Sequence, residues 1–172
     1  MRHFIIGIVI VNEGRDEIAE LCREFEVEAR KRNKWSETSD AANIAYMNMV
    51  VGTTKFEGRM FYALFSGIAD YLAYAADAIK AATIAYPVAN ETTSVVYDAL
   101  PVSLERPLMK LLRQRGVKVD KVRGLRKEQN EPLLMLADAV CGLARDAQLG
   151  KREAVALLAK ATRRGAVVET RG

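Results

Sequence analysis

Residues 130–144 carry the sequence NEPLLMLADAVCGLA, which has the pattern of a long apolar helix with one acid, Asp138, in its interior. At 3.6 residues per turn, Ala137, Cys141 and Gly142 lie beside Asp138 on one stripe of this helix. Because such a helix is expected to be buried, the carboxylate needs a charged partner, hydrogen bonds or a metal. The small neighbours would let another backbone approach it.

Composition predicts one domain over residues 1–172. The chain has 172 residues, 50% of them hydrophobic, which is enough for a substantial core. The longest apolar run, 4–11, is too short to cross a bilayer, so we expect a cytoplasmic protein without a membrane partner. Cys22 and Cys141 lie on apolar helix faces and are expected as small buried hydrophobes, without a disulfide-linked partner. The single histidine, His3, argues against a His-based zinc site or a Ser-His-Asp triad.

The charges are divided unevenly along the chain. Residues 1–100 contain 10 Lys/Arg and 14 Asp/Glu, whereas residues 101–172 contain 16 and 8. The basic residues of the second part cluster between Arg113 and Lys127. A phosphate-bearing partner such as nucleic acid and an ordinary solvated surface are both compatible with this pattern.

The pattern of apolar residues predicts alternating strands and helices. Strands are expected at 4–11, 59–65, 94–98 and 117–122, the last with one solvated face because it alternates strictly. Helices are expected at 15–32, from a cap at Ser39 or Asp40 to 51, and at 68–86, 104–114, 130–144 and 151–164. The remaining C-terminal tail is expected to fray. This order indicates an α/β fold in which helices cover a partly parallel sheet.

Two acids are candidates for a functional site. Asp98 follows the strand 94–97, and function in open α/β sheets collects beyond the carboxyl ends of strands. Asp138 is expected on a helix packed on the same sheet. If both carboxylates face one pocket, Mg²⁺ or Mn²⁺ would relieve their repulsion and support phosphodiester cleavage. The alternative is structural, since such acids often cap turns or accept hydrogen bonds.

Several of these segments together resemble a widespread microbial domain-of-unknown-function family with a ribonuclease H-like fold. The resemblance runs from about Phe4 to Ala144. It rests on the first strand and amphipathic helix, the pair Lys34-Trp35, the strand ending in Asp98, and Leu-Met-Leu-Ala-Asp at 134–138 with Gly142 just after it. It implies a ribonuclease H-like mixed sheet flanked by helices.

The chain departs from this family pattern at its start. Members typically open with a strand carrying Asp-Glu-Ser-Gly, which is absent here unless residues 11–14 are a remnant of it. The resemblance therefore implies a sheet that lacks its first, central strand, a gap that dimerisation, an upstream segment or a changed strand order must fill. Of the implied acids, Asp98 and Asp138 match, with Glu37 or Glu28 as a stand-in for another, so a catalytic set would be Asp98, Asp138 and Glu37.

A second group of residues is expected to contact nucleic acid. Lys34 and Trp35 would grip a phosphate and stack on a base, although a lone Trp between two helices is more often anchored in the core. The rest of the group is basic: Lys121, Arg123, Arg126 and Lys127.

Two functional hypotheses follow, and whether the protein is an enzyme stays open between them. The first is a metal-dependent nuclease with Asp98 and Asp138 as ligands of Mg²⁺ or Mn²⁺, bound weakly because two acids are few. The second, which we prefer because the first acid is missing, is a degenerate nuclease-like module that binds nucleic acid or a partner protein, often as a homodimer.

Overall fold

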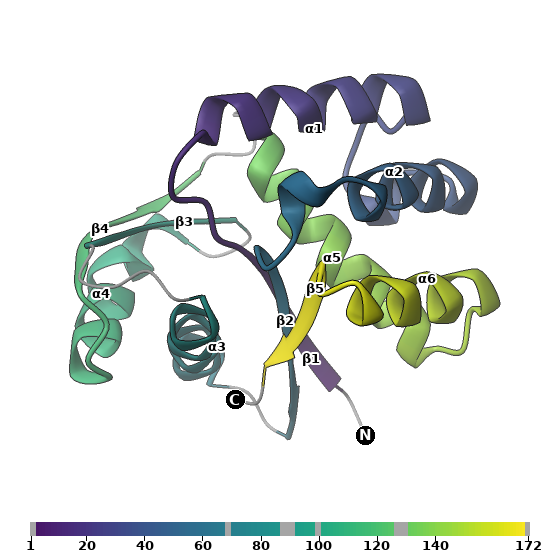
Figure 1. Cartoon of the computed structure of the whole chain (residues 1–172). Helices are drawn as coiled ribbons and strands as arrows, with labels where there is room; N and C mark the ends of the chain where they lie inside the picture. The colour runs from purple at the N-terminus through teal and green to yellow at the C-terminus, as the bar shows by residue number, and fades with distance from the viewer. Residues whose placement is uncertain (1–2, 68–69, 87–91, 99–100, 126–130, 171–172) are drawn as a thin grey trace.

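The computed structural model describes residues 3–67, 70–86, 92–98, 101–125 and 131–170. Its strands are β1 (His3–Val9), β2 (Met60–Ser66), β3 (Thr93–Tyr97), β4 (Val119–Gly124) and β5 (Val167–Thr170) (Figure 1). Its α-helices are α1 (Arg15–Ala29), α2 (Asp40–Gly52), α3 (Tyr71–Ala85), α4 (Glu105–Gln114), α5 (Pro132–Gln148) and α6 (Arg152–Arg163). Short 3₁₀ helices are η1 (Trp35–Glu37), η2 (Thr54–Phe56) and η3 (Val102–Leu104). The predicted α/β class is confirmed.

The described strands form two sheets where the sequence analysis expected one. In the first, β1 pairs antiparallel with β2, and β2 pairs parallel with β5. In the second, β3 pairs parallel with β4, with an irregularity in register near Thr93 and Ser94. The prediction that the C-terminal tail frays is wrong for residues 167–170, because these extend the first sheet as β5 and Val167 is fully buried.

Helices cover both faces of β1 and β2. Alternate residues of β1 point to opposite faces. Ile5 and Val9 pack against the core shared with α5, whereas Phe4, Ile6 and Ile8 pack towards Tyr74 and Ala78 of α3. The continuous apolar run at 4–11 is thus explained, although its side chains are only partly buried.

The helix α5 approaches β1 very closely. A Cβ atom at Gly7 would lie 2.2 Å from the carbonyl oxygen of Ala137, so a residue without a side chain is required there. The thiol of Cys141 donates to the Ile5 carbonyl (3.4 Å). Burial raises the pKa of Cys141 to about 11 and that of Cys22 to about 12, and both cysteines are unpaired thiols.

Among the described residues, helices α3 and α4 cover one face of the second sheet. Its inner residues, among them Val95 and Val122, pack on Leu108 and Leu112 of α4 and on Ala76 of α3. Figure 1 shows α3 and α4 together on this side of β3 and β4. The other face carries exposed side chains: Ser94, Val96, Lys121 and Arg123. The solvated face predicted for the strand at 117–122 is therefore confirmed.

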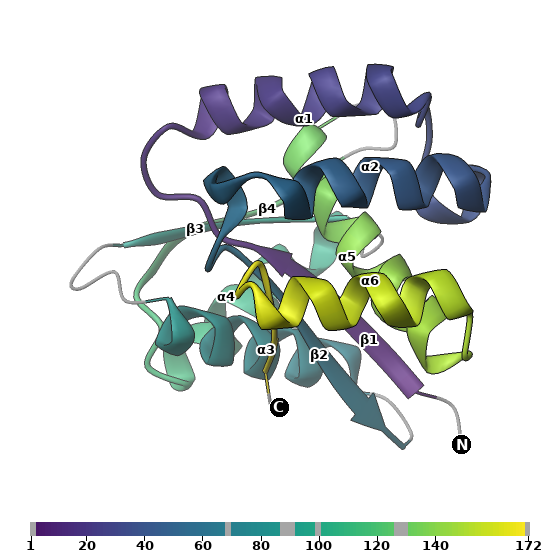
Figure 2. The same ribbon diagram turned by 45° about the vertical axis from the view of Figure 1, so that its right-hand side comes forward.

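The remaining helices build the larger core around α5. In Figure 2, α1, α2 and α6 lie side by side in front of α5. The centre of this core contains fully buried side chains from α2, η2 and α5, including Tyr46, Phe56 and Leu136. Ser39 caps α2 by accepting the Ala42 N–H (3.3 Å), as one of the two predicted caps. No helix in the described ranges is long and apolar enough to span a membrane.

Candidate functional site

An ion pair joins the start of η1 to the end of β3. Lys34 precedes η1 and Asp98 directly follows β3, 64 positions later in the chain. The ammonium Nζ of Lys34 lies 2.5 Å from Oδ2 of Asp98, with the two side chains 41% and 34% exposed. The pair is therefore accessible to solvent and sits at the carboxyl end of the β3–β4 sheet, where the sequence analysis expected function.

Three predicted acids affect the pKa of Lys34. The hydrogen bond to Asp98 is the largest cause of a raised pKa at Lys34, partial burial opposes it, and the charges of Asp98, Asp138 and Glu37 add to it. Asp98 ends one sheet, whereas Asp138 lies on a helix that packs on the other. The prediction that they face each other across a common sheet is therefore wrong; the two acids bind adjacent residues instead, Asp98 the Lys34 ammonium and Asp138 the Trp35 N–H.

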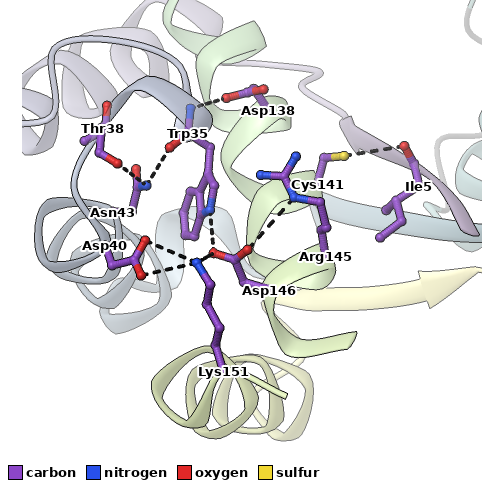
Figure 3. A network of polar contacts seen from close by, with 10 residues as sticks. All are labelled: Ile5, Trp35, Thr38, Asp40, Asn43, Asp138, Cys141, Arg145, Asp146 and Lys151. Carbon is purple, nitrogen blue, oxygen red and sulfur yellow. Dashed lines mark hydrogen bonds and ion pairs between the residues drawn. The ribbon is translucent and has the colours of Figure 1, made fainter. Parts of the chain in front are cut away.

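Asp138 is held by the backbone of the same segment. Its Oδ2 accepts the main-chain N–H of Trp35 at 2.7 Å (Figure 3). This bond is charge-assisted and satisfies an N–H group at the start of η1 that has no partner within the 3₁₀ turn. Asp138 is only partly buried, and its carboxylate binds the residue that directly follows Lys34.

The ring of Trp35 lies in the core. Trp35 is 4% exposed, and its indole Nε1 donates to Oδ2 of Asp146 at 2.9 Å. A Cβ atom at Gly142 would lie 2.2 Å from Cγ of Trp35, so the ring packs directly on the backbone of α5. In this conformation the ring cannot stack on a base, and the core-anchor interpretation of Trp35 is the one that the structure supports.

Asp146 binds Trp35 beside the candidate site, and the sequence analysis did not name it. It is 5% exposed and is the buried acid of α5, a role that the sequence analysis gave to Asp138. Its Oδ2 lies 3.1 Å from Nζ of Lys151, which also contacts Asp40. The signal was present in the sequence: Asp138, Gly142 and Asp146 are spaced i, i+4 and i+8, so they share one helix face along which Trp35 lies.

A second lysine, Lys31, lies inside the protein near this site. It is 3% exposed, its Nζ donates to the Asn33 carbonyl at 2.6 Å, and it lies 5.4 Å from the centroid of the Tyr46 ring. Burial lowers the pKa of Lys31, and the charges of Glu26 and Asp138 partly offset that effect. The negative charge of Asp138 therefore raises the pKa of two lysines, the buried Lys31 and the accessible Lys34.

The predicted basic residues are only partly within the described structure. Lys121 and Arg123 are exposed on the outer face of β4, and Arg123 is paired with Val96, two positions before Asp98. Arg126 and Lys127 lie outside the described residues. Of the two that are described, Arg123 lies nearer the sheet end that holds the ion pair, whereas Lys121 is paired with Ser94 near the start of β3.

The donor set fits an ammonium better than a divalent metal. In the ranges that the structure describes, no three His, Cys, Asp or Glu side chains gather as metal ligands. One oxygen of Asp98 already binds Lys34, and one of Asp138 binds the Trp35 N–H. The positive charge that two close acids require is thus supplied by the protein itself.

Comparison with protein-family models, with curated proteins and with solved structures finds no match for this chain.

Proposed function

We propose that this protein is a degenerate nuclease-like module of ribonuclease H-like fold that binds nucleic acid. The observation that carries the proposal is the ion pair of Lys34 with Asp98, with Asp138 bound to the adjacent Trp35 N–H. Acids at the two matching positions thereby bind adjacent residues of one segment. The exposed Lys121 and Arg123 on the outer face of β4 offer contacts to a phosphate backbone.

The arrangement of strands supports the proposed fold. An antiparallel pair, β1 and β2, is followed by a parallel pair, β3 and β4, and then by the acid-bearing helix α5. A break between β1 and β3 is expected of a ribonuclease H-like sheet whose central first strand is not among the described strands.

The charge balance of the site supports binding over cleavage. Phosphodiester cleavage by metal ions requires carboxylate oxygens that are open to the ions. Here Lys34 neutralises Asp98, and the Trp35 N–H holds Asp138 in a fixed position. Both acids serve to position the Lys34-Trp35 segment, which leaves recognition of the nucleic acid to the basic residues.

Nucleic-acid binding is tested by fluorescence anisotropy with labelled 20-mers of single- and double-stranded DNA and RNA at 50 mM salt. We expect the wild-type protein to bind at least one probe, and Lys121→Gln/Arg123→Gln to bind it roughly ten-fold more weakly because two phosphate contacts are lost. The matched control is Lys160→Gln/Arg163→Gln on α6, which removes the same charge from exposed positions of another element. Absence of binding to every probe would refute the proposal and leave a partner protein as the candidate ligand.

A metal-dependent nuclease is the second candidate. It is favoured by the negative charges of Asp98, Asp138 and Glu37, which all raise the pKa of Lys34. In that case Asp98 and Asp138 would bind Mg²⁺ or Mn²⁺, which would supply an activated water and stabilise the leaving oxygen. Calorimetric titration of Mg²⁺ and Mn²⁺ into the wild type, Lys34→Met and Asp138→Asn is the test. This candidate requires binding heat that Lys34→Met increases and Asp138→Asn abolishes; no heat in the wild type or in Lys34→Met eliminates it.

A further inference from the structure

The outer face of α4 is a stripe of basic side chains. Leu108 and Leu112 point into the core between α4 and the second sheet. On the opposite face, residues one turn apart line a shallow cavity of about 610 Å³: Arg106, Met109, Lys110, Arg113 and Gln114. Three of these five are cations, and no acid is among the described residues that line the cavity.

The acids near this stripe form hydrogen bonds or ion pairs with residues outside it. Residues 105–125 contain seven Lys/Arg and two Asp/Glu. The carboxylate of Glu105 accepts the Gly124 N–H (2.8 Å), and that of Asp120 accepts the Ser94 hydroxyl (2.8 Å). Arg115, directly after α4, forms an ion pair with Asp77 of α3. The stripe therefore keeps its positive charge.

The stripe begins at the sheet end that holds the candidate site. The bond from Gly124 to Glu105 places the first turn of α4 beside the end of β4, and Leu125 donates to the Tyr97 carbonyl (3.0 Å), directly before Asp98. At the other end of α4, Arg113 donates to the Val119 carbonyl at the start of β4. From Arg106 to Arg113 the helix rises about 10 Å, roughly the axial rise of three phosphates of one strand of a duplex.

We propose that this stripe binds the phosphodiester backbone of the nucleic acid and guides it towards the Lys34–Asp98 end of the sheet. The inference rests on the proposed function and adds a surface that the sequence analysis did not identify, on the opposite side of β4 from Lys121 and Arg123. Guanidinium and ammonium groups bind phosphates without reading bases. The contact is therefore independent of sequence and sensitive to salt.

The test compares three double variants by anisotropy between 50 and 200 mM salt, with the probe that the wild type binds best. They are Arg106→Gln/Lys110→Gln on α4, Lys121→Gln/Arg123→Gln on β4, and the α6 control Lys160→Gln/Arg163→Gln. Arg113 is kept because it bonds the β4 main chain. For the α4 variant we expect a Kd roughly ten-fold higher at 50 mM salt and, on a duplex, a slope of log K against log salt reduced by about 2.

The outcomes separate this inference from the function on which it rests. If the α4 variant keeps the wild-type Kd and salt slope while the β4 variant is weakened, the stripe is not a binding surface and the proposed function stands. If the wild type binds no probe, both the proposed function and this inference are refuted. An equal loss in the α6 control would show a general charge effect and overturn the inference. Lys110→Gln alone, with its circular dichroism spectrum, guards against misfolding of the double variant.

Discussion

At the scale of single residues, Trp35 organises the candidate site. Its main-chain N–H binds Asp138, its ring packs on Gly142, and its indole N–H binds Asp146. Trp35 thus contacts α5 at three positions spaced one turn apart, and these contacts set the position of the neighbouring Lys34. The ion-pair partner of Asp98, Lys34, therefore belongs to a segment that is held in place mainly by the buried contacts of Trp35.

We expect Asp146→Asn to lower the free energy of unfolding by about 2 kcal/mol, because it weakens a buried, charge-assisted contact to Trp35 and Lys151. Urea denaturation followed by circular dichroism measures this. The matched control is Asp40→Asn, which contacts the same Lys151 but has a side chain 66% exposed, against 7% for Asp146. The control should cost less than about 0.5 kcal/mol; equal losses in both variants would contradict the assigned role of Asp146.

We expect the Lys34 ammonium to titrate above the ordinary lysine pKa, and Asp98→Asn to bring its pKa back towards that value. The pH titration of its ¹³Cε resonance, assigned with Lys34→Arg, measures both. A folded pKa above the unfolded value means that the pair stabilises the protein below about pH 10.4 and loses this effect as pH rises through the folded pKa. Because the pair is partly exposed, its contribution stays below about 1 kcal/mol. An ordinary pKa in the wild type would refute the ion pair in solution.

At the scale of elements, α5 connects the parts of the larger core. One face receives β1 at Gly7, and another receives the Trp35 ring at Gly142. Both approaches are close enough that a single added carbon would collide. The small residues that the sequence analysis noted beside Asp138 therefore have the predicted consequence, and the groups that come close at these positions are a strand and an indole ring.

We expect Gly142→Ala to displace Trp35, because the new Cβ would lie 2.2 Å from the ring. Overpacking of this kind costs about 1–3 kcal/mol. Trp35 is the only tryptophan, so a red shift of the intrinsic fluorescence in the native state reports the displacement directly. The control is Gly52→Ala at the end of α2, where nothing lies within 4 Å of the added carbon. Unchanged fluorescence and stability in Gly142→Ala would contradict the packing described.

At the scale of the whole molecule, the described strands divide between two sheets that share α3. This helix contributes Leu72, Ala76 and Ile79 to the core of the second sheet, and it meets the first sheet through Tyr74 and Ala78. The Lys34–Asp98 pair links the same two regions from another side. The C-terminal strand β5 completes the first sheet by pairing in parallel with β2.

We expect removal of residues 166–172 to lower the free energy of unfolding by about 3 kcal/mol or more, because Ala166 and Val167 are fully buried and β2 loses its parallel partner. Thermal unfolding compares this truncation with one that removes only residues 171–172, which should leave Tm unchanged. Equal Tm values for the two truncations would show that β5 contributes nothing to the fold.

Local patterns predicted most of the elements but not their partners. Apolar periodicity located the helices and β1 to β4, since period and capping residues such as Ser39 act over a few positions. β5 was missed because a run of four residues has no period to detect. Asp146 was missed, and Trp35 was left open between a nucleic-acid contact and a core anchor, because burial depends on contacts between segments more than 100 positions apart.

The sequence alone determined the α/β class, the small residues Ala137, Cys141 and Gly142 beside Asp138 on one helix face, and the basic character of the second half, because these depend on neighbours along the chain. Only the tertiary structure decided that Lys34 pairs with Asp98, that Trp35 is buried, and that the described strands divide into two sheets. Each of these results depends on segments that folding brings together from distant positions, and the energy of such contacts is not encoded in any local pattern.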